Sequence, residues 1–499
     1  MNTGGFNLIH DPWIPIGDRQ ISIREALIDA HNLPGWPGGD FGLAEAVLRL
    51  LIPIAYRLTD ADQSVTDEDF AAHQASALDT ARFHEEAVDR YLDRHADRFW
   101  LVGGPEDCHP FGQDKTLESV SPHEAAKAVT VWASGNNAVL GPHFATDVLP
   151  EGLAAQRLLV LRHYAWGGLH TKHPVWTKQG KFVGSPLRGT MSVHPVARTF
   201  AETLIGHLVP LLGGQTDFGL PFWEQPPPST TVMPHAKRAG LLEQIAGRQD
   251  KTMLLRTEEG KITGFTIAEG PGVDRSLFCE DPYLLYGPDG EPRKPKASKA
   301  FWRESEALVA KNKDGKNEAR AHILEWATGE NGGTIYPPGR FSWAVVSHLG
   351  DKSKDLIWDR HLVPDLLSVF EPAAALRARE FIHLADEAEK RLTSQIAKLW
   401  HQTGQMPAKP EHRFYVYSPA RSELWRLAET DFWQVVAGTE NTGQQAIKDR
   451  LRGYALQGYD RATEHLSHAP RTLLDVIESR KWLELWERAS SPPTGEEAA

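Results

Sequence analysis

One stretch of the chain combines basic and aromatic side chains with a complete absence of carboxylates. No Asp or Glu occurs between Gly152 and Ala201, although the chain holds 66 acidic residues and its formal net charge is -12. Fixed positive charge with flat side chains for stacking is what contact with a polyanion needs. The alternative is that half of the stretch is buried core and the rest is an ordinary loop. Its cations and aromatic rings are Arg157, Arg162, Lys172, Lys178, Lys181, Arg188 and Arg198, with Tyr164, Trp166, Trp176 and Phe182.

Patterns that indicate catalysis are weaker. The chain has no Gly-x-x-x-x-Gly-Lys-Ser/Thr, no His-Glu-x-x-His and no Gly-x-Ser-x-Gly. Cys108 beside His109 could pair a thiol with a base, but neighbouring residues in a strand point to opposite faces. His465 and His468 have a spacing that can bind metal on a helix, although surface histidines are far more frequent. We therefore predict no catalytic residue, no metal site and no cofactor, and a role in recognition or assembly.

Up to about residue 360, the elements expected to position these side chains form a mixed α/β domain. Phe6–Ile16 is expected to be extended, because Pro12 and Pro15 do not fit a helix interior. A short helix is expected after Ser22, since Ser22 and Glu25 have the spacing of a capping box. These features predict a domain that opens with short strands and a capped helix.

Longer elements are expected further along the same domain. Phe41–Leu58 is apolar nearly all round, which indicates a buried helix. Helices are also expected over Val120–Trp132 and Val193–Leu212, whereas Leu158–Leu161 is expected in the core. Strands are expected over Lys261–Ile267 and, as a hairpin, over Phe341–Leu349 and Leu356–Leu362.

The pattern becomes purely helical after about residue 360. Long amphipathic segments with short connectors predict an antiparallel four-helix bundle. We therefore expect a mixed α/β (α+β) domain over residues 1–360 and the bundle over residues 361–499. The helical segments are Pro364–Trp400, Ser418–Ala437, Gln444–His468 and Arg471–Ser490.

Composition limits the class of protein. The chain has no apolar run long enough to span a membrane, no secretory signal pattern, and only two cysteines, so a reducing cytoplasm is the simplest location. Residues 1–100 hold 17 Asp and Glu against eight Arg and no Lys. This acidity argues against a free-standing protein that coats nucleic acid, and suits a subunit with a local basic face that partners hold in place.

The opening residues then point to a known family. Phe-Asn-Leu-Ile-His-Asp-Pro-Trp-Ile-Pro-Ile, at Phe6–Ile16, resembles the N-terminal signature of the large subunit (CasA) family of the type I-E CRISPR surveillance complex, Cascade. The likeness covers essentially the whole chain and keeps the order of its parts. Further matching segments are Ser134–Leu140, Ser185–Gly189, Asp281–Tyr283, Arg293–Pro295 and Ala300–Arg303.

The resemblance implies a non-catalytic task in antiviral defence. Members of the family have a mixed α/β domain and a C-terminal four-helix bundle. They contact the 5′ handle of the crRNA, recognise the protospacer-adjacent motif in target double-stranded DNA from the minor groove, and promote duplex opening. They also bind the backbone and small subunits of Cascade and help recruit the helicase-nuclease of the system. As in other guided effectors, the protein reads a short flanking motif and base pairing reads the rest.

The resemblance also implies which residues touch nucleic acid. Asn136, Asn137, Val139 and Leu140 match the loop that touches the crRNA handle. A second loop, which approaches the minor groove, is matched by Lys178–Gly184, which contains Gly180 and Lys181, and by Arg188 just after it. That loop is normally richer in glycine. Because the minor groove offers a degenerate hydrogen-bond code, permissive reading of the flanking motif is implied.

Two more basic segments follow from the resemblance. Asp351–Lys354 matches the hairpin tip that acts as a wedge between base pairs, with Lys352, Ser353 and Lys354 where a polar amide residue is typical. Lys294 or Lys296 matches a basic finger in the minor groove. Some members carry a zinc knuckle, which two cysteines cannot form. Two alternatives stay open: a metal-dependent nuclease or hydrolase with scattered His and Asp residues, and a purely structural scaffold subunit.

Overall fold

The computed structural model describes most of the chain, which divides into two compact units. The first unit consists of Met1–Ala297 with Asn312–Leu366, and the second of Ser298–Lys311 with Leu367–Ala499. The division falls after Leu366, and it assigns Ser298–Lys311 to the second unit. The described residues are 5–106, 108–125, 148–165, 172–175, 185–211, 217–226, 240–247, 251–270, 280–295, 302, 305–309, 319–351, 354–409, 413–438, 443–468 and 470–484.

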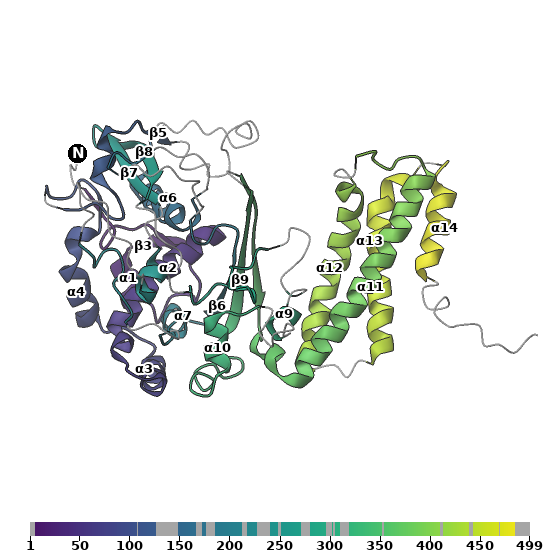
Figure 1. Ribbon diagram of the computed structural model, residues 1–499, viewed down its shortest axis with the longest axis horizontal. Helices are drawn as coiled ribbons and strands as arrows, with labels where there is room; N and C mark the ends of the chain where they lie inside the picture. The colour runs from purple at the N-terminus through teal and green to yellow at the C-terminus, as the bar shows by residue number, and fades with distance from the viewer. Residues whose placement is uncertain are drawn as a thin grey trace, which may run out of the picture. The chain divides into compact units, whose positions relative to one another are not determined.

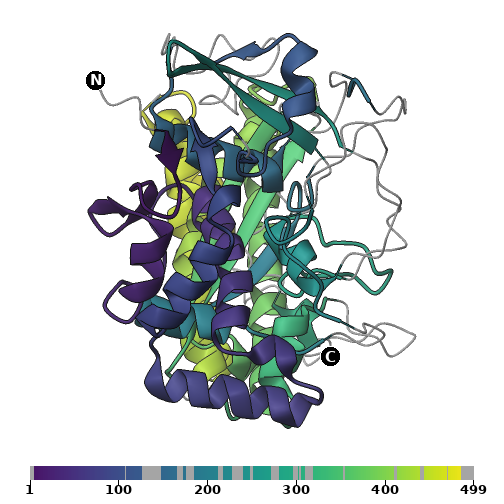
Figure 2. The same cartoon turned by 90° about the vertical axis from the view of Figure 1, so that its left-hand side faces the viewer.

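The helices of the first unit gather around α2, which contacts α4, α6, α7 and α8 (Figures 1 and 2). Helix α2 has the predicted bounds, and the predicted capping box starts α1, where the Ser22 hydroxyl accepts from the Glu25 amide at 3.2 Å. The helices are α1 (Ile23–Ile28), α2 (Phe41–Leu58), α3 (Asp67–Thr80), α4 (Glu85–Arg94), α6 (Glu151–Tyr164), α7 (Phe200–Gly206), α8 (Leu241–Ala246) and α10 (His322–Thr328).

The strands of the first unit form small antiparallel sheets in the described part of the chain. The three-stranded sheets have the orders β10-β9-β6 and β5-β8-β7, and the pairs are β1-β4 and β2-β3. The predicted strand at Lys261–Ile267 and the predicted hairpin are confirmed as β8 and as β9-β10. The strands are β1 (Phe6–Asn7), β2 (Ile14–Ile16), β3 (Arg19–Ile21), β4 (Trp100–Val102), β5 (His123–Glu124), β6 (Met191–Val196), β7 (Lys251–Glu258), β8 (Lys261–Glu269), β9 (Ser342–Asp351) and β10 (Lys354–Val363).

Two predicted helices are wrong in part. Val193–Val196, expected in a helix, belongs to β6, which pairs with β9 at the edge of its sheet and so tolerates Pro195. The helix of this region starts only after Thr199, whose side chain caps α7. His123–Glu124, the described strand within the expected helix Val120–Trp132, pairs with β8 instead. In both places a tertiary partner decides the conformation of a short segment.

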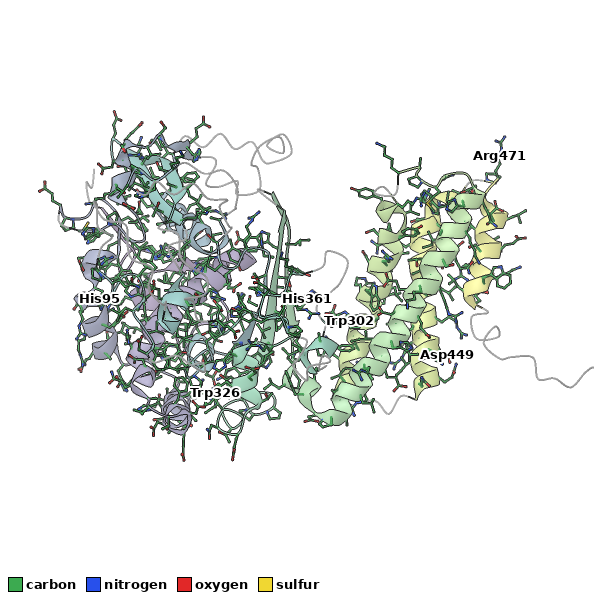
Figure 3. All side chains as sticks on the ribbon, viewed as in Figure 1. His95, Trp302, Trp326, His361, Asp449 and Arg471 are labelled. Atoms are coloured by element: carbon green, nitrogen blue, oxygen red, sulfur yellow. The ribbon has the colours of Figure 1, made fainter. Side chains whose placement is uncertain are left out.

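The second unit is helical. Trp302 and Leu367–Phe370 (η7) belong to it, and Trp302 packs against Phe381, Trp425 and Phe432 with ring centroids 4.8–6.1 Å apart (Figure 3). The four long helices fall where the sequence predicted helices, and α11 contacts α12, α13 and α14. The helices are α9 (Glu306–Val309), α11 (Pro372–Gln402), α12 (Phe414–Ala437), α13 (Gln444–Ser467) and α14 (Leu473–Glu484).

Candidate nucleic-acid interface

The structure describes only some of the residues predicted to touch nucleic acid. Arg188 and Lys294 are described, and so is the backbone of Lys354. The remaining predicted contacts lie outside the described residues: Asn136, Asn137, Val139, Leu140, Lys178, Gly180, Lys181, Gly184, Lys296, Lys352 and Ser353. The structure shows how the described residues that flank these segments are held.

Part of the positive charge in the acid-free stretch is structural. Helix α6 buries Leu158–Leu161, as predicted, together with Arg162 and His163. The Arg162 guanidinium lies 3.6 Å from the centre of the Phe222 ring, and its Nε donates to the Gly247 carbonyl at 3.0 Å. Arg157 pairs with Asp40 at 3.2 Å. The alternative that part of the stretch is core is thus correct for α6, and Lys172, Arg188 and Arg198 are among its accessible cations.

Residues Ser185–Arg188 are hydrogen-bonded to the end of α6. The Ser185 amide donates to the Ala165 carbonyl at 2.9 Å, and the Leu187 amide donates to the His163 carbonyl at 3.1 Å. The Arg188 guanidinium donates to the Tyr164 carbonyl at 3.3 Å. Ala165 and Ser185 are therefore held together, and the Arg188 guanidinium binds beside them.

His173, which lies in the chain between Ala165 and Ser185, is also held by hydrogen bonds. His173 is buried, and its Nε2 lies 3.0 Å from both Asp114 Oδ2 and Thr116 Oγ1. Burial acts to raise the pKa of Asp114, but the hydrogen bonds from His173 and Thr116 outweigh it and hold that pKa below its usual range. The Val175 amide donates to His173 Nδ1 at 3.1 Å. Val175 and Ser185, the described residues on either side of the predicted minor-groove segment, are therefore each held by a hydrogen bond.

The other described cations lie on turns and strand ends. The predicted hairpin is longer than expected: β9 reaches Asp351 and β10 starts at Lys354, so that these two residues pair directly. Lys294 is exposed just after a turn in which the Arg293 amide donates to the Leu285 carbonyl at 2.7 Å. The exposed Lys294 is thus placed where its side chain can reach a ligand.

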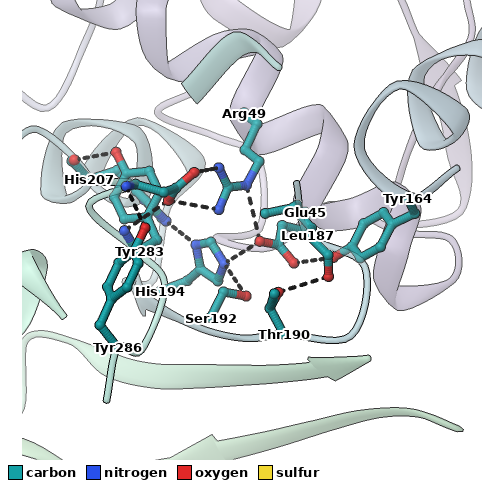
Figure 4. Close-up of polar contacts among 11 residues, drawn as sticks. Glu45, Arg49, Tyr164, Leu187, Thr190, Ser192, His194, His207, Tyr283 and Tyr286 are labelled. Carbon is teal, nitrogen blue, oxygen red and sulfur yellow. Dashed lines mark hydrogen bonds and ion pairs between the residues drawn. The ribbon is translucent and has the colours of Figure 1, made fainter. Parts of the chain in front are cut away.

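A buried polar network holds the base of these segments (Figure 4). Glu45 and Arg49, one turn apart on α2, are joined by a 3.0 Å ion pair, and Arg49 also binds Asp281 through two donors at 2.6 and 3.1 Å. The Tyr164 hydroxyl, at the end of α6, donates to the second Glu45 oxygen. All four side chains are buried. The network therefore fixes the end of α6 to α2 and to the Asp281 segment.

Ionisation of this network follows from its contacts. Burial acts to raise the pKa of Glu45, but the neighbouring His194 and Arg49 and two hydrogen bonds outweigh it, so that its pKa lies well below the ordinary value. Burial raises the pKa of the Tyr164 hydroxyl well above its ordinary value, which keeps it a hydrogen-bond donor. The carboxylate of Glu45 is thus charged and fully paired. Sequence reasoning missed these residues, although a charged pair at i, i+4 in an apolar helix was a signal.

Two histidines extend the network toward β6 and α7. His194 Nε2 lies 3.1 Å from Glu45 Oε1 and 3.1 Å from Ser192 Oγ, and its Nδ1 lies 3.1 Å from His207 Nε2. Ser192, His194 and Glu45 include the side-chain types of a hydrolytic triad. In a triad, however, the serine and the carboxylate bind opposite ring nitrogens, whereas here both lie at Nε2 and all three side chains are buried. The trio therefore gives the hydrolase alternative no support.

We expect these buried histidines to make folding sensitive to acid. Burial lowers the pKa of His207 well below its ordinary value of 6.5, and that of His163 likewise, so both are neutral in the folded chain. The unfolded chain binds their protons below about pH 6.5, so stability present above that pH is lost as the pH falls, by up to about 1.4 kcal/mol per pH unit for each histidine. His207→Asn should flatten the fall in thermal unfolding temperature between pH 7 and 5. An unchanged slope would contradict this assignment.

The described residues offer no other centre of reactive groups. No three His, Cys, Asp or Glu side chains among them are grouped so as to hold a metal ion. Cys108 is buried, and burial raises its pKa. His465 and His468 are exposed on or beside α13, where the ring of His465 lies 5.5 Å from that of Trp400. A search of the described helices for one long and apolar enough to cross a membrane finds none.

Comparison with known proteins places the chain in a family. The model of the family described as CRISPR-associated protein Cse1 matches residues 7–458. The chain therefore belongs to the CRISPR-associated protein Cse1 family. The sequence resemblance to the large-subunit (CasA) family of type I-E Cascade is thereby confirmed.

Individual relatives agree with this assignment. A protein of Thermus thermophilus, "CRISPR-associated protein CasA/Cse1", is 27% identical over 94% of both chains. A chain of a solved "CRISPR RNA-guided surveillance complex" has a TM-score of 0.74 at 24% identity, covering 96% of this chain and 100% of that chain. The crystal structure of Thermobifida fusca Cse1 has a TM-score of 0.72 at 18% identity and covers 97% of both chains. The fold is therefore shared across the length of the molecule.

Proposed function

We propose that this chain is the non-catalytic large subunit of a type I-E Cascade. In this role it contacts the 5′ handle of the crRNA, recognises the protospacer-adjacent motif of target double-stranded DNA from the minor groove, and promotes opening of the duplex. Its protein partners are the backbone and small subunits and the helicase-nuclease of the system, and its place of action is the cytoplasm. The observation that carries the proposal is the match of the Cse1 family model to residues 7–458.

The proposal assigns a task to each basic segment. Asn136, Asn137, Val139 and Leu140 touch the crRNA handle. Lys178, Gly180, Lys181, Gly184 and Arg188 meet the minor groove, where backbone close to glycine can approach the bases. Lys294 or Lys296 adds a second minor-groove contact, and Lys352, Ser353 and Lys354 act at the point of strand separation. Support comes from family membership and from the exposed position of Lys294 after a turn.

The second unit serves assembly in this proposal. We propose that α11–α14 form an antiparallel four-helix bundle within a domain that follows residue 360. Support comes from the packing of α11 on α12, α13 and α14 and of α12 on α13. Ion pairs between helices, such as Arg421 with Glu389 at 2.7 Å, favour the same arrangement. A bundle of this kind offers a stable outer surface to protein partners.

Target binding by the assembled complex tests the proposal. We expect a complex that lacks this subunit to lose affinity for target duplex and its preference for the flanking motif. With the subunit present, Lys178→Glu together with Lys181→Glu should lower the slope of log affinity against log salt by about one per lost phosphate contact. The matched control is Lys178→Arg with Lys181→Arg, which keeps both charges. Equal affinity and equal motif preference with and without the subunit would refute the proposed function.

A further inference from the structure

A cluster of three aromatic rings joins the hairpin β9-β10 to the end of α6. His348 of β9 and Trp358 of β10 are direct cross-strand partners, and their ring centroids lie 4.5 Å apart at 69°. The Tyr164 ring, at the end of α6, lies 4.4 Å from the Trp358 ring and 5.4 Å from the His348 ring. Such centroid distances and inclined ring planes are typical of stabilising aromatic contacts. The hairpin is therefore packed on the same tyrosine that the Glu45 network fixes.

His348 also makes a directional contact with the returning chain. It is 1% exposed, and its Nδ1 accepts a hydrogen bond from the Gly189 amide at 2.9 Å. Because a backbone amide only donates, Nδ1 carries no proton in this contact. The His348 amide in turn donates to the Thr190 carbonyl at 3.0 Å. Gly189 has a φ of +74°, a conformation that favours glycine and turns the chain at this contact.

The three rings lie between the end of the hairpin and the segment Ser185–Thr190, so they can hold these two elements in a fixed relative position. Strand β9 ends at Asp351, three positions after His348, and β10 begins at Lys354, four positions before Trp358, so that these two residues lie about 10–14 Å from the ring pair along the hairpin. Ser185, whose amide donates to the Ala165 carbonyl, lies four positions before Gly189. A movement of either element by one hydrogen-bond length would break the His348–Gly189 contact.

We infer that His348 is a positioning residue, which holds the hairpin end at a fixed offset from the segment Ser185–Thr190. The inference rests on the proposed function, since the offset matters only if both elements act on one nucleic acid. Tyr164 and Trp358 supply packing to this link, and the hydrogen bond to Gly189 supplies its direction. Loss of the bond leaves both elements folded but no longer in register. Duplex opening, which needs both at once, then suffers more than binding to DNA that is already open.

Three substitutions of His348 in the assembled complex test the inference. His348→Asn places an oxygen near the position of Nδ1 and keeps an acceptor for the Gly189 amide. His348→Leu removes the acceptor, and His348→Gln moves it out of reach. We expect the last two to slow opening of target duplex by about three- to thirtyfold, the range in which single residues of coupled networks act, and His348→Asn to change it less. Opening is followed by the fluorescence of a base analogue beside the flanking motif.

The controls separate this inference from the proposed function. Binding to a target with a pre-melted bubble should change less than about twofold in every variant, because it needs no coordinated opening. Unchanged opening in His348→Leu and His348→Gln, or equal losses on both targets, would overturn the inference. Failure of both variants to enter the complex would overturn it too, since His348 would then be structural. A complex without the subunit that opens duplex as well as the complete one refutes the proposed function instead.

Discussion

Replacement of Arg49 by methionine is expected to destabilise the first unit by about 3–5 kcal/mol, because it removes the counter-ion of the buried Asp281 and one of the partners of the buried Glu45. Arg49 is 0% exposed and binds both Glu45 and Asp281, which are equally buried. Methionine fills a similar volume, so lost packing contributes little to the effect. Urea unfolding followed by tryptophan fluorescence measures the loss, since Trp13, Trp223 and Trp343 are all buried in this unit.

A surface arginine provides the matched control. Arg24 also binds two carboxylates, Glu85 and Asp89, but its side chain is 34% exposed. Exposed pairs contribute only about 0–1 kcal/mol, so Arg24→Met should change stability little. Adding Asp281→Asn to Arg49→Met should recover part of the loss, because it removes the charge left without its counter-ion. Equal effects of Arg49→Met and Arg24→Met would show that the buried network does not hold the unit together.

Removal of the hairpin lysines is expected to separate duplex opening from binding. Lys352→Ala with Lys354→Ala should weaken opening of target duplex by about tenfold, equivalent to about 1.4 kcal/mol, and should weaken binding to pre-melted DNA less. In the proposed role, the lysines hold phosphates of the two strands as these separate. In a pre-melted target the strands are already apart, so the lysines contribute less to binding. The measurement compares affinities of the assembled complex for both targets at one salt concentration.

The charge-retaining variant Lys352→Arg with Lys354→Arg is the control for the hairpin. It should keep most of the opening activity if charge at the tip is what matters, since arginine also binds phosphate. Equal losses of the alanine variant on the two targets would refute a role in strand separation. An equal loss in the arginine variant would instead indicate that the shape of the lysine side chains is required.

Local sequence signals predicted the elements that depend on near neighbours. The helix Phe41–Leu58, the capping box at Ser22 and the hairpin follow from periodicity and from contacts a few residues apart. Predictions failed where a distant strand decided the outcome. Val193–Val196 becomes a strand because β9 is available to pair with it, a partner some 150 positions away in the sequence.

Whether a charged side chain is buried or exposed could not be predicted from local sequence signals. Composition located the acid-free stretch, and the resemblance gave it a task, but neither could tell a buried cation from an accessible one. Arg162 and His163 look as suited to a polyanion as Arg188, yet the first two are buried beside Gly247, and Arg162 also lies against the Phe222 ring. Burial depends on which distant elements cover a side chain, and one sequence carries no direct record of that.

The family, most of the elements and the segments with basic character could therefore be predicted from the amino-acid sequence. The contacts that hold the residues around those segments follow from the folded chain. Glu45, Arg49, Asp281, Tyr164 and His348 come from parts of the chain separated by up to about 300 positions, and their contacts are made only after the fold has closed. Pairing and burial are properties of that closed state, because water would otherwise screen each charge and satisfy each hydrogen bond.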